Sequence, residues 1–521
     1  MSGISFSNPW KLIVRRLDAT GMYRTVTLAL LTLVVISVVV SILKLMPYSP
    51  LELLFSLIVA VGVALLANLI FARLCRVSAN HESALITALI IFFLILPPQL
   101  EELQYLLVTA AVVVGAIASK YIIVWRKQHL LNPAAAGVVA VMLVYEFFPL
   151  PPGYFEANWW IGQPILLLPL VLVGSLVVQK VRKWVPVVSF VSVAFIFSIF
   201  ETWRLTGVAL DGWYYFFTSG PSLFLAFFML TEPFTLPPTK KLQGIYGAFV
   251  GFLSQTLLFS PWLKVTPEVA LLLGNVIFYP FSLRQKLFLK LKEKHAIGQN
   301  TYEFVFEKPA GLRFLPGQYL EWMLPHASAD ARGKRRYFTI ASAPTEADVR
   351  LGLKVSEKGS SYKTALLKLD VGESVIASQL AGDFILPKSA EQKLGFIAGG
   401  IGITPFRSHL KHMIDSGHAS DAVLYYCNSK REDIAYQNIF EMAKAKFNFE
   451  VVHVIAEEEV GAPFEQGFVT AEMLKRRTPD YLTRHWYLSG PPGMVNAYNT
   501  LLLKLGVPHR HITKDFFPGL A

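Results

Sequence analysis

Hydrophobic and polar positions follow two different patterns along the chain. Up to about Arg284 long apolar runs succeed one another, and from Lys286 onward short apolar runs alternate with charged residues. Apolar runs of about 20 residues are typical of membrane-spanning helices, whereas short alternating runs are typical of strands. The pattern therefore predicts a polytopic α-helical membrane domain at residues 1–285, followed by a module large enough for two compact lobes.

The first half contains ten apolar segments, of which several are short for a straight membrane span. They lie near residues 25–46, 51–72, 83–98, 104–125, 133–148, 162–179, 185–202, 214–232, 244–262 and 268–283. The third segment ends at Pro97-Pro98, and the eighth leads into Pro237-Pro238. Because proline interrupts a helix, we expect broken or re-entrant helices at these two segments.

Basic residues gather in the loops after every second apolar segment. These loops hold Arg73 and Arg76, Arg126 and Lys127, Lys180, Arg182 and Lys183, Lys240 and Lys241, and Arg284 and Lys286. Positive loops stay in the cytoplasm, so we expect a multi-pass protein of the cytoplasmic membrane with both termini and the second half cytoplasmic. The net charge of +12 then reflects topology, and lipid rather than nucleic acid is the expected surrounding partner.

Cysteine and histidine are too sparse for a metal or haem centre. Cys75 and Cys427 lie far apart and form neither a disulfide framework nor a metal quartet, so no metal site is expected. The first 285 residues contain His81 and His129 alone, both beside basic residues at a predicted membrane edge. A pair of stacked haems needs histidines on facing helices, and the sequence excludes it.

Polar residues within the apolar segments are candidates for function. Asn132 opens the fifth segment, Thr231 and Glu232 close the eighth, and Lys120 lies inside the fourth. Helix capping alone explains the Asn-Pro pair at Asn132. Charge at membrane depth is costly and tends to be functional, although Lys120 is also long enough to reach the membrane surface.

Four stretches in this half resemble a known family of membrane subunits. They read "SALITALIIFFLILPP", "LNPAAAG", "AFFMLTEPFTLPP" and "PEVALLLGNVIFYP". They are similar to NqrB and RnfD, of the sodium-pumping NADH:quinone reductase and the Rnf complex, over about residues 20–285. The resemblance implies ten helices in two inverted five-helix repeats, with flavins that pass electrons through the bilayer.

One feature of that family is missing from the sequence. Its typical members attach FMN covalently to a threonine in the outer loop after the fifth segment, but here this loop reads "EFFPLPPGYFEANWW". The loop has neither threonine nor serine, so we expect no covalent FMN at the usual position. Any FMN or riboflavin in the membrane domain is expected to bind non-covalently, near Asn132 and Thr231 on the cytoplasmic side.

The second half changes rhythm once more along its length. Closely spaced short strands predict a small antiparallel β-barrel at about residues 293–388. Strand–helix alternation then predicts a parallel α/β lobe at 389–521, with helices near 404–416, 434–446, 470–475 and 492–505.

The barrel contains a strand that suits a flavin. "RYFTIAS" offers a cation for phosphate, aromatic faces for the isoalloxazine ring and hydroxyls for its edge. Together with "PGQY", "AGGIGITP" and "YLSGPPGMV", in this order, the strand resembles the ferredoxin–NADP reductase family over about residues 293–521. The resemblance makes this second half an FAD-binding barrel domain followed by an NAD(P)H-binding domain.

The resemblance also assigns roles within the FAD site. Arg336 is expected to pair with the FAD pyrophosphate, Phe338 to pack on the ring, and Thr339 to hydrogen-bond near N5 as a catalytic residue. Further cofactor-binding candidates are Tyr337 and Ser342 on the same strand, and Gly359, Ser360 and Ser361 before a helix. A helix start with small hydroxyls binds phosphate well, although an ordinary serine cap explains the last three equally.

The nicotinamide nucleotide has its own candidate residues. Glycines allow a close backbone approach to pyrophosphate, and Thr-Pro starts the helix whose dipole faces it. The residues are Gly399, Gly400, Gly402, Thr404 and Pro405. By the resemblance, Ser489, Gly490 and Pro491 lie on the nicotinamide side, with Ser489 catalytic, and Phe516 or Phe517 covers the flavin.

The sequence favours NADH slightly over NADPH. A 2′-phosphate would bind Lys430 or Arg431 after the second strand of the lobe, whereas Glu432 or Asp433 would repel it. A solvated loop explains these four residues equally well.

These features predict a membrane flavoprotein oxidoreductase. It would oxidise cytoplasmic NAD(P)H through FAD and pass electrons into or across the membrane to a quinone or an extracytosolic redox protein. Two alternatives remain open: an inverted-repeat transporter regulated by its reductase domain, and a membrane-anchored reductase for a soluble cytosolic acceptor.

Overall fold

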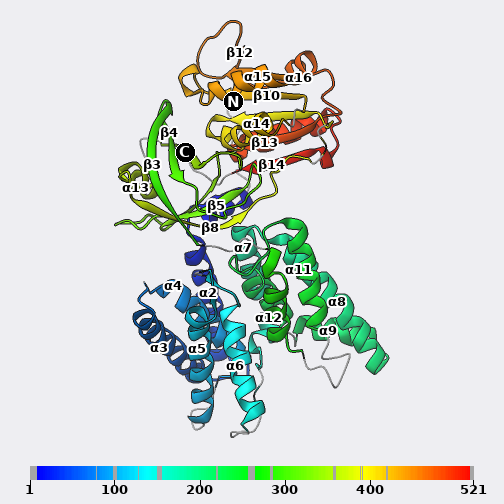
Figure 1. The fold of residues 1–521 in the computed structure, drawn as a ribbon. Coiled ribbons are helices and arrows are strands. Elements are labelled where there is room, and N and C mark those ends of the chain that lie inside the picture. Colours follow the sequence, from blue (N-terminus) through cyan, green and yellow to red (C-terminus); the bar gives the residue numbers. More distant parts are fainter. Residues whose placement is uncertain are drawn as a thin grey trace, which may run out of the picture. The chain divides into compact units, whose positions relative to one another are not determined.

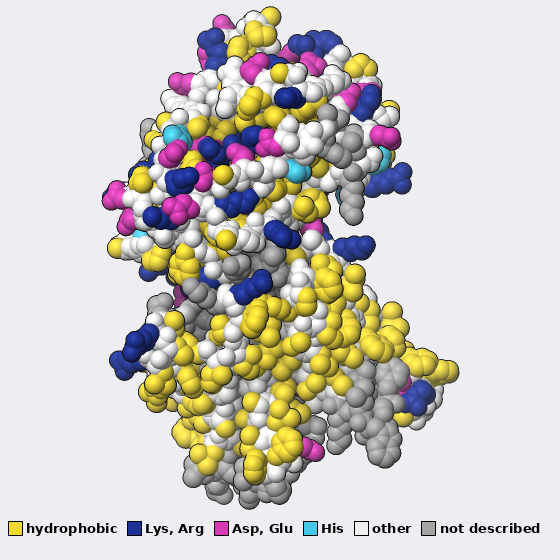
Figure 2. Space-filling view, in the orientation of Figure 1, with side chains coloured by type: hydrophobic (Ala, Val, Ile, Leu, Met, Phe, Trp, Pro, Cys, Tyr) yellow, Lys and Arg dark blue, Asp and Glu magenta, His cyan; other side chains and the backbone are white. Residues whose placement is uncertain are grey.

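The chain folds into two compact units, Met1–Gln285 and Lys286–Ala521, each described here by itself (Figure 1). The computed structural model describes residues 9–77, 79–97, 103–126, 128–148, 155, 157–218, 221–255, 265–281, 286–355, 360–387, 389, 391–417 and 420–516. On the face shown in Figure 2, side chains of the first unit are mostly hydrophobic, while those of the second unit mix charged and apolar types.

The first unit is built from α-helices. They are α1 (Pro9–Asp18), α2 (Met22–Ile42), α3 (Pro50–Leu74), α4 (His81–Leu94), α5 (Leu103–Ile122), α6 (Pro133–Phe147), α7 (Leu167–Val181), α8 (Trp184–Thr206), α9 (Ala209–Thr218), α10 (Ser222–Phe224), the π-helix η3 (Leu225–Met229), α11 (Lys240–Leu253) and α12 (Pro267–Ile277). Among the residues that the structure describes, four helical stretches are long and apolar enough to cross a membrane, at Met22–Ile42, Pro50–Leu74, Pro164–Val181 and Trp184–Thr206. With the shorter apolar helices, they confirm the predicted polytopic helical class.

Helix packing in this unit repeats after five segments. The helix α3 packs on α5 as α8 packs on α11, and α2 contacts α4 as α7 contacts η3. Residues from the start of α2 and from the end of α7 line one common pocket, so the two equivalent helices run in opposite directions. This arrangement agrees with the inverted repeat that the family resemblance implies.

The predicted broken helices are α4 and the α10–η3 segment. Both are short, and the residues from Thr87 to Leu94 and from Ser222 to Leu230 are buried. Asn132 begins the helix α6, because its side chain accepts a hydrogen bond from the Ala135 N–H and Pro133 occupies the first turn. This cap gives α6 a defined start within an apolar environment.

The second unit begins with an antiparallel sheet in the order β6-β5-β8-β3-β4-β7. Its strands are β3 (Leu287–Gly298), β4 (Thr301–Glu307), β5 (Tyr319–Met323), β6 (Arg335–Thr339), β7 (Asp348–Lys354) and β8 (Ser374–Ala381). The helix α13 (Ser361–Lys368) follows β7. The expected start of the barrel at residue 293 falls inside β3, which already begins at Leu287.

A parallel sheet follows, in the order β12-β11-β10-β9-β13-β14. Its strands are β9 (Leu394–Gly399), β10 (Ala422–Asn428), β11 (Phe449–Ile455), β12 (Glu465–Gln466), β13 (His485–Gly490) and β14 (Ile512–Phe516). The helices are α14 (Thr404–Ser416), α15 (Gln437–Lys446), α16 (Ala471–Arg477) and α17 (Pro492–Lys504), each close to its predicted place. The central position of β9 places the glycine loop beside the end of β13.

Candidate functional sites

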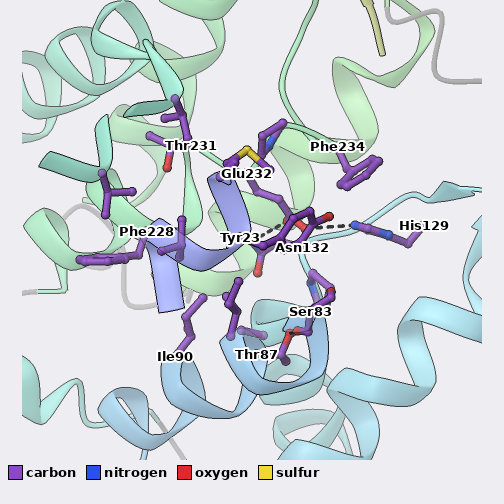
Figure 3. Close-up of a pocket in the computed structure, with 18 residues that line it drawn as sticks. Tyr23, Ser83, Thr87, Ile90, His129, Asn132, Phe228, Thr231, Glu232 and Phe234 are labelled. Atoms are coloured by element: carbon purple, nitrogen blue, oxygen red, sulfur yellow. Dashed lines mark hydrogen bonds and ion pairs between the residues drawn. The ribbon is translucent and has the colours of Figure 1, made fainter. Parts of the chain in front are cut away.

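The first unit contains a pocket at the end where most of its basic loops lie. Its empty volume, open solvent included, is about 680 Å³. It is lined by residues from the starts of α2, α4 and α6, from the end of α7, and from the turn after η3, among them Ser83, Thr87, Asn132, Thr231 and Glu232. Figure 3 shows these side chains converging from segments that are far apart in the sequence. Asn132 and Thr231, predicted to lie near one another, line the same pocket.

A polar network surrounds Glu232 in this pocket. Its Oε1 lies 3.0 Å from His129 Nε2, and its Oε2 accepts a hydrogen bond of 2.9 Å from the Asn132 side chain (Figure 3). The Asn132 backbone N–H donates to Asn275 Oδ1 at 2.7 Å, and the Asn275 amide donates to the Tyr246 hydroxyl at 2.8 Å. The sequence identified Asn132 and Glu232 but not these partners, which approach only through tertiary packing.

Lys120 contributes a cation near the same network. Its ammonium group donates to the backbone carbonyl and the hydroxyl of Ser83, both at 2.9 Å. Ser83 itself lines the pocket, at the start of α4. Lys120 therefore joins α5 to the rim of the pocket.

In the second unit, Arg336 and Phe338 lie on one face of β6. The Arg336 guanidinium stacks over the Tyr362 ring at 5.4 Å, and the Phe338 ring lies 5.9 Å from the same ring. The guanidinium also donates to both carboxylate oxygens of Asp330, at 2.8 and 2.9 Å. Although partial burial by itself raises the pKa of Asp330, the guanidinium charge and hydrogen bonds lower it overall.

Two predicted residues of this strand take other partners. Tyr337 lies on the opposite face of β6 from Arg336, because side chains alternate along a strand, and its hydroxyl reaches Glu321 and Gln379. Ser342 accepts a hydrogen bond from the Arg350 N–H, while its carbonyl accepts one from Ser408 on α14. Through these two hydrogen bonds Ser342 joins the barrel to the lobe, and its role at the cofactor stays a prediction.

The start of α13 forms a cationic cradle beside Arg336. Ser360 caps the helix, and the Ser361 hydroxyl accepts from the Asp330 N–H at 2.9 Å and lies 3.0 Å from His326 Nε2. Burial, followed by the charges of Arg332 and Arg336, lowers the pKa of Lys363 to about 8. Like charges crowded around a helix N-terminus fit a pyrophosphate, whose charge would relieve their repulsion. Lys363 was not among the sequence candidates, and Gly359 lies outside the described residues.

The glycine loop packs directly against the end of β13. A Cβ placed on Gly402 would lie 2.6 Å from the Ser489 carbonyl oxygen and 2.7 Å from Gly490 Cα. Gly400 has a φ of +50°, and Thr404 and Pro405 follow in the first turn of α14. Two motifs almost 90 residues apart in the sequence thus form one surface of exposed backbone at a helix start. That surface fits a dinucleotide phosphate.

Both predicted catalytic hydroxyls are buried. Thr339 Oγ1 and Ser489 Oγ have no hydrogen-bond partner among the residues that the structure describes. Thr339 is 2 % exposed and Ser489 is 0 % exposed. Buried polar atoms normally have partners, so these two are suited to a bound cofactor.

The C-terminal strand leads toward the same region. In the β13–β14 pairing, Phe516 stands opposite Gly490 and Asp515 opposite Ser489. The backbone of Phe516 is thereby placed beside the expected nicotinamide site. Phe517 lies outside the described residues, and the question of which phenylalanine covers the flavin stays a prediction.

Comparisons with known proteins match each half separately. Residues 154–281 match the NQR2, RnfD, RnfE family, and residues 396–500 match the oxidoreductase NAD-binding domain. The reductase component of propane 2-monooxygenase from Rhodococcus jostii is 30% identical over 221 residues, which cover 41% of this chain and 58% of that protein. A ferredoxin–NAD(P)+ reductase component from a Ralstonia species is 28% identical, over 40% of this chain and 62% of its own length.

The chain thus spans about three-fifths of the length of these two relatives. A solved reductase structure, the cytochrome P450 reductase of Amycolatopsis, is 21% identical and covers 46% of this chain and 72% of its own, with a TM-score of 0.41. NADH-cytochrome b5 reductase 1 of Cryptococcus neoformans is 28% identical, over 46% of this chain and 87% of that protein. These matches support a fusion of a membrane region similar to the NQR2, RnfD, RnfE family with an oxidoreductase module similar to ferredoxin–NAD(P) reductases.

Proposed function

We propose that this protein oxidises cytoplasmic NAD(P)H through FAD and passes the electrons into or across the membrane. A quinone or an extracytosolic redox protein would receive them. One observation carries the proposal: the chain that holds the FAD and nicotinamide cradles also contains a polar, aromatic-lined pocket at the basic end of its membrane unit. Because both units belong to one chain, the reductase module stays tethered to that membrane.

In the reductase module, residues around the two cradles would hold the cofactors and keep water away from them. Arg336, Lys363 and the start of α13 would bind the FAD pyrophosphate, and Phe338 would pack against the ring. The buried Thr339 and Ser489 hydroxyls would gain hydrogen bonds at the reacting edges of the flavin and the nicotinamide. When bound, FAD accepts a hydride from the nicotinamide and releases its two electrons singly.

The pocket of the membrane unit would hold a second, non-covalent flavin such as FMN or riboflavin. Its polar groups include Thr231, Asn132, Glu232 and Ser83, and Phe228 and Phe234 supply aromatic faces. Ligand sites combine such an apolar lining with a few convergent polar groups. The basic loops at this end support a cytoplasmic position for the pocket.

We infer that NADH is the preferred nucleotide. The Arg431 guanidinium, which a 2′-phosphate would need, is already paired with Glu458 at 2.6 Å. An exposed pair of this kind is weak, so the preference is expected to be modest. Replacement of Glu458 by Gln should shift the ratio of kcat/KM toward NADPH, and an unchanged ratio would argue against this assignment.

Counting the flavins on the purified full-length protein tests the proposal. We expect FAD together with a second flavin that is released by denaturation, because the sequence lacks the usual attachment threonine. A Glu232→Ala variant should lose the second flavin and retain FAD. One flavin per chain, all of it FAD, would contradict the internal electron route and favour a transporter or a membrane-anchored reductase.

A further inference from the structure

Aromatic rings form a continuous column through the core of the first unit. The column consists of Phe228, Phe224, Phe93, Trp160 and Tyr48. Successive ring centroids lie 4.9, 5.5, 5.2 and 5.7 Å apart. These spacings are those of rings in van der Waals contact, so the column contains no gap between its members.

The column leads from the pocket toward the opposite end of the unit. Phe228 lines the pocket, which also includes Met22 and Tyr23 at the start of α2. Tyr48 follows the other end of α2, a helix of 21 residues that measures about 30 Å at 1.5 Å per residue. Phe224, Phe93 and Trp160 are at most 1 % exposed, whereas Tyr48 is only half-buried. The column therefore runs from the pocket through a dry interior to a more accessible residue.

Both broken helices contribute to the middle of the column. Phe93 lies at the end of α4, and Phe224 lies at the start of the α10–η3 segment. Their rings meet at the ends of the two segments that lie away from the pocket.

A strained loop holds Trp160 in this position. The N–H groups of Asn158 and Trp159 both donate to the Leu94 carbonyl oxygen at 2.9 Å, and so cap the broken helix α4. Trp159 has a φ of +54°, which is unusual for a bulky residue and is typical of functional sites. The indole of Trp159 donates to Glu268 at 2.8 Å, and that of Trp160 donates to the Phe92 carbonyl oxygen at 2.6 Å.

We propose that this aromatic column is the electron path from the pocket to the opposite face of the membrane. The inference rests on the proposed function, and it supplies a route across the part of the bilayer that a flavin in the pocket does not reach. Electrons tunnel more readily through packed π-systems than through saturated side chains. The rings act as a bridge, and none of them is oxidised or reduced.

The electron balance is simple. Each transfer removes one electron from the reduced donor in the pocket and delivers it to an oxidant of the quinone or ferric class at the far end. Two transfers consume the electron pair of one NAD(P)H, and the proton stays on the pocket side.

Reconstituted vesicles test the path with the full-length protein. Ferricyanide is trapped inside the vesicles and NADH is added outside. Only protein molecules whose reductase module faces outward can oxidise this NADH. Reduction of a dye added outside reports the module alone. We expect Phe93→Leu and Phe224→Leu to slow the reduction of trapped ferricyanide severalfold and to leave the external dye reaction unchanged.

Matched controls separate the ring from the packing. Phe200→Leu removes an aromatic side chain that is 46 % exposed on α8, away from the column, and should have no effect. Trp160→Phe keeps a ring in the column and should preserve the transfer.

The outcomes distinguish the path from the proposed function. If the unsubstituted protein reduces trapped ferricyanide and both Phe→Leu variants do so equally fast, the column is overturned while transmembrane transfer stands. If the unsubstituted protein does not reduce trapped ferricyanide, transfer across the membrane fails and the column with it, whereas NADH-dependent reduction of a quinone within the membrane would leave the proposed function standing. Flavin content and thermal stability identify a variant that is misfolded. If one of the two Phe→Leu variants is misfolded, the other is sufficient for the test.

Discussion

At the scale of single residues, the two buried hydroxyls give the clearest separation of function from stability. Thr339 Oγ1 has no hydrogen-bond partner among the described residues, so the protein without cofactor bears the cost of burying it. We expect Thr339→Val to leave the free energy of unfolding of flavin-free protein unchanged or to raise it by about 1 kcal/mol. Hydride transfer, measured by stopped-flow flavin reduction, should slow by roughly tenfold, which corresponds to about 1.4 kcal/mol.

Thr301 offers a matched control for this substitution. It is equally buried on β4, but its hydroxyl donates to the Gln299 carbonyl oxygen at 3.0 Å. Thr301→Val should therefore lower stability by about 1 kcal/mol and leave hydride transfer unchanged. A Thr339→Val variant that is destabilised but fully active would show that its hydroxyl has only a structural role.

Lys363 predicts a pH dependence of FAD binding. Its pKa is lowered to about 8, first by burial and then by Arg332 and Arg336, so the ammonium form is disfavoured before the cofactor binds. A pyrophosphate favours the protonated form, and affinity for FAD should therefore fall as the pH rises through about 8. The free energy of unfolding of flavin-free protein changes in the opposite direction. It should rise with pH between about 8 and the unfolded pKa of about 10.4, because the cost of burying the charged lysine is lost there.

Titration of flavin-free protein with FAD from pH 6.5 to 9.5 checks this expectation. Lys363→Gln should bind FAD about tenfold more weakly at low pH, since a charge-assisted hydrogen bond contributes about 1.5 kcal/mol, and should lose the transition near pH 8. Lys368→Gln, at the other end of α13, is the control. A transition that persists in Lys363→Gln would assign it to another group.

At the scale of elements, the glycine loop depends on close packing between two strand ends. A methyl group on Gly402 would overlap the backbone of Ser489 and Gly490, so Gly402→Ala must push the loop away from β13. We expect the KM for the nicotinamide nucleotide to rise at least tenfold while FAD remains bound, which equals about 1.4 kcal/mol of binding energy. Gly461→Ala, where a Cβ meets nothing within 4 Å, should behave as the unsubstituted protein.

Prolines and a long-range cap account for the two broken membrane helices. Pro97 and Pro237 indicated the interruptions from the sequence, because proline cannot continue a helix. The sequence did not indicate that Asn158 and Trp159 supply the cap of α4, since this contact joins segments more than 60 residues apart. Nor did it indicate that the eighth segment contains a π-helical turn.

At the scale of the whole molecule, the native cysteines report on orientation. Cys75 is exposed at the end of α3, beside Arg73 and Arg76, whereas burial raises the pKa of Cys427 to about 12 and makes its thiol unreactive. A membrane-impermeant maleimide should therefore label Cys75 in inside-out vesicles and not in intact cells. Cys75→Ser should abolish the labelling, and labelling of Cys75 from outside the cell would reverse the proposed topology.

The sequence by itself determined the features that local patterns encode. Hydropathy and loop charge separate the membrane half from the soluble half, and short motifs around Arg336, Gly402 and Ser489 indicate a flavin and a dinucleotide. These features follow from helix and strand periodicity and from the few residue types that suit a phosphate. Asn132 and Thr231, chosen because they are polar within apolar segments, do line one pocket.

Only the tertiary structure decided which residues meet across long stretches of chain. It brought His129 and Asn275 to the network around Glu232 and Asn132, placed Lys363 beside Arg336, and joined Ser342 of the barrel to Ser408 of the lobe. It also aligned aromatic rings from four segments into one column. Such contacts depend on how helices and strands pack, and no local pattern in the sequence records that arrangement.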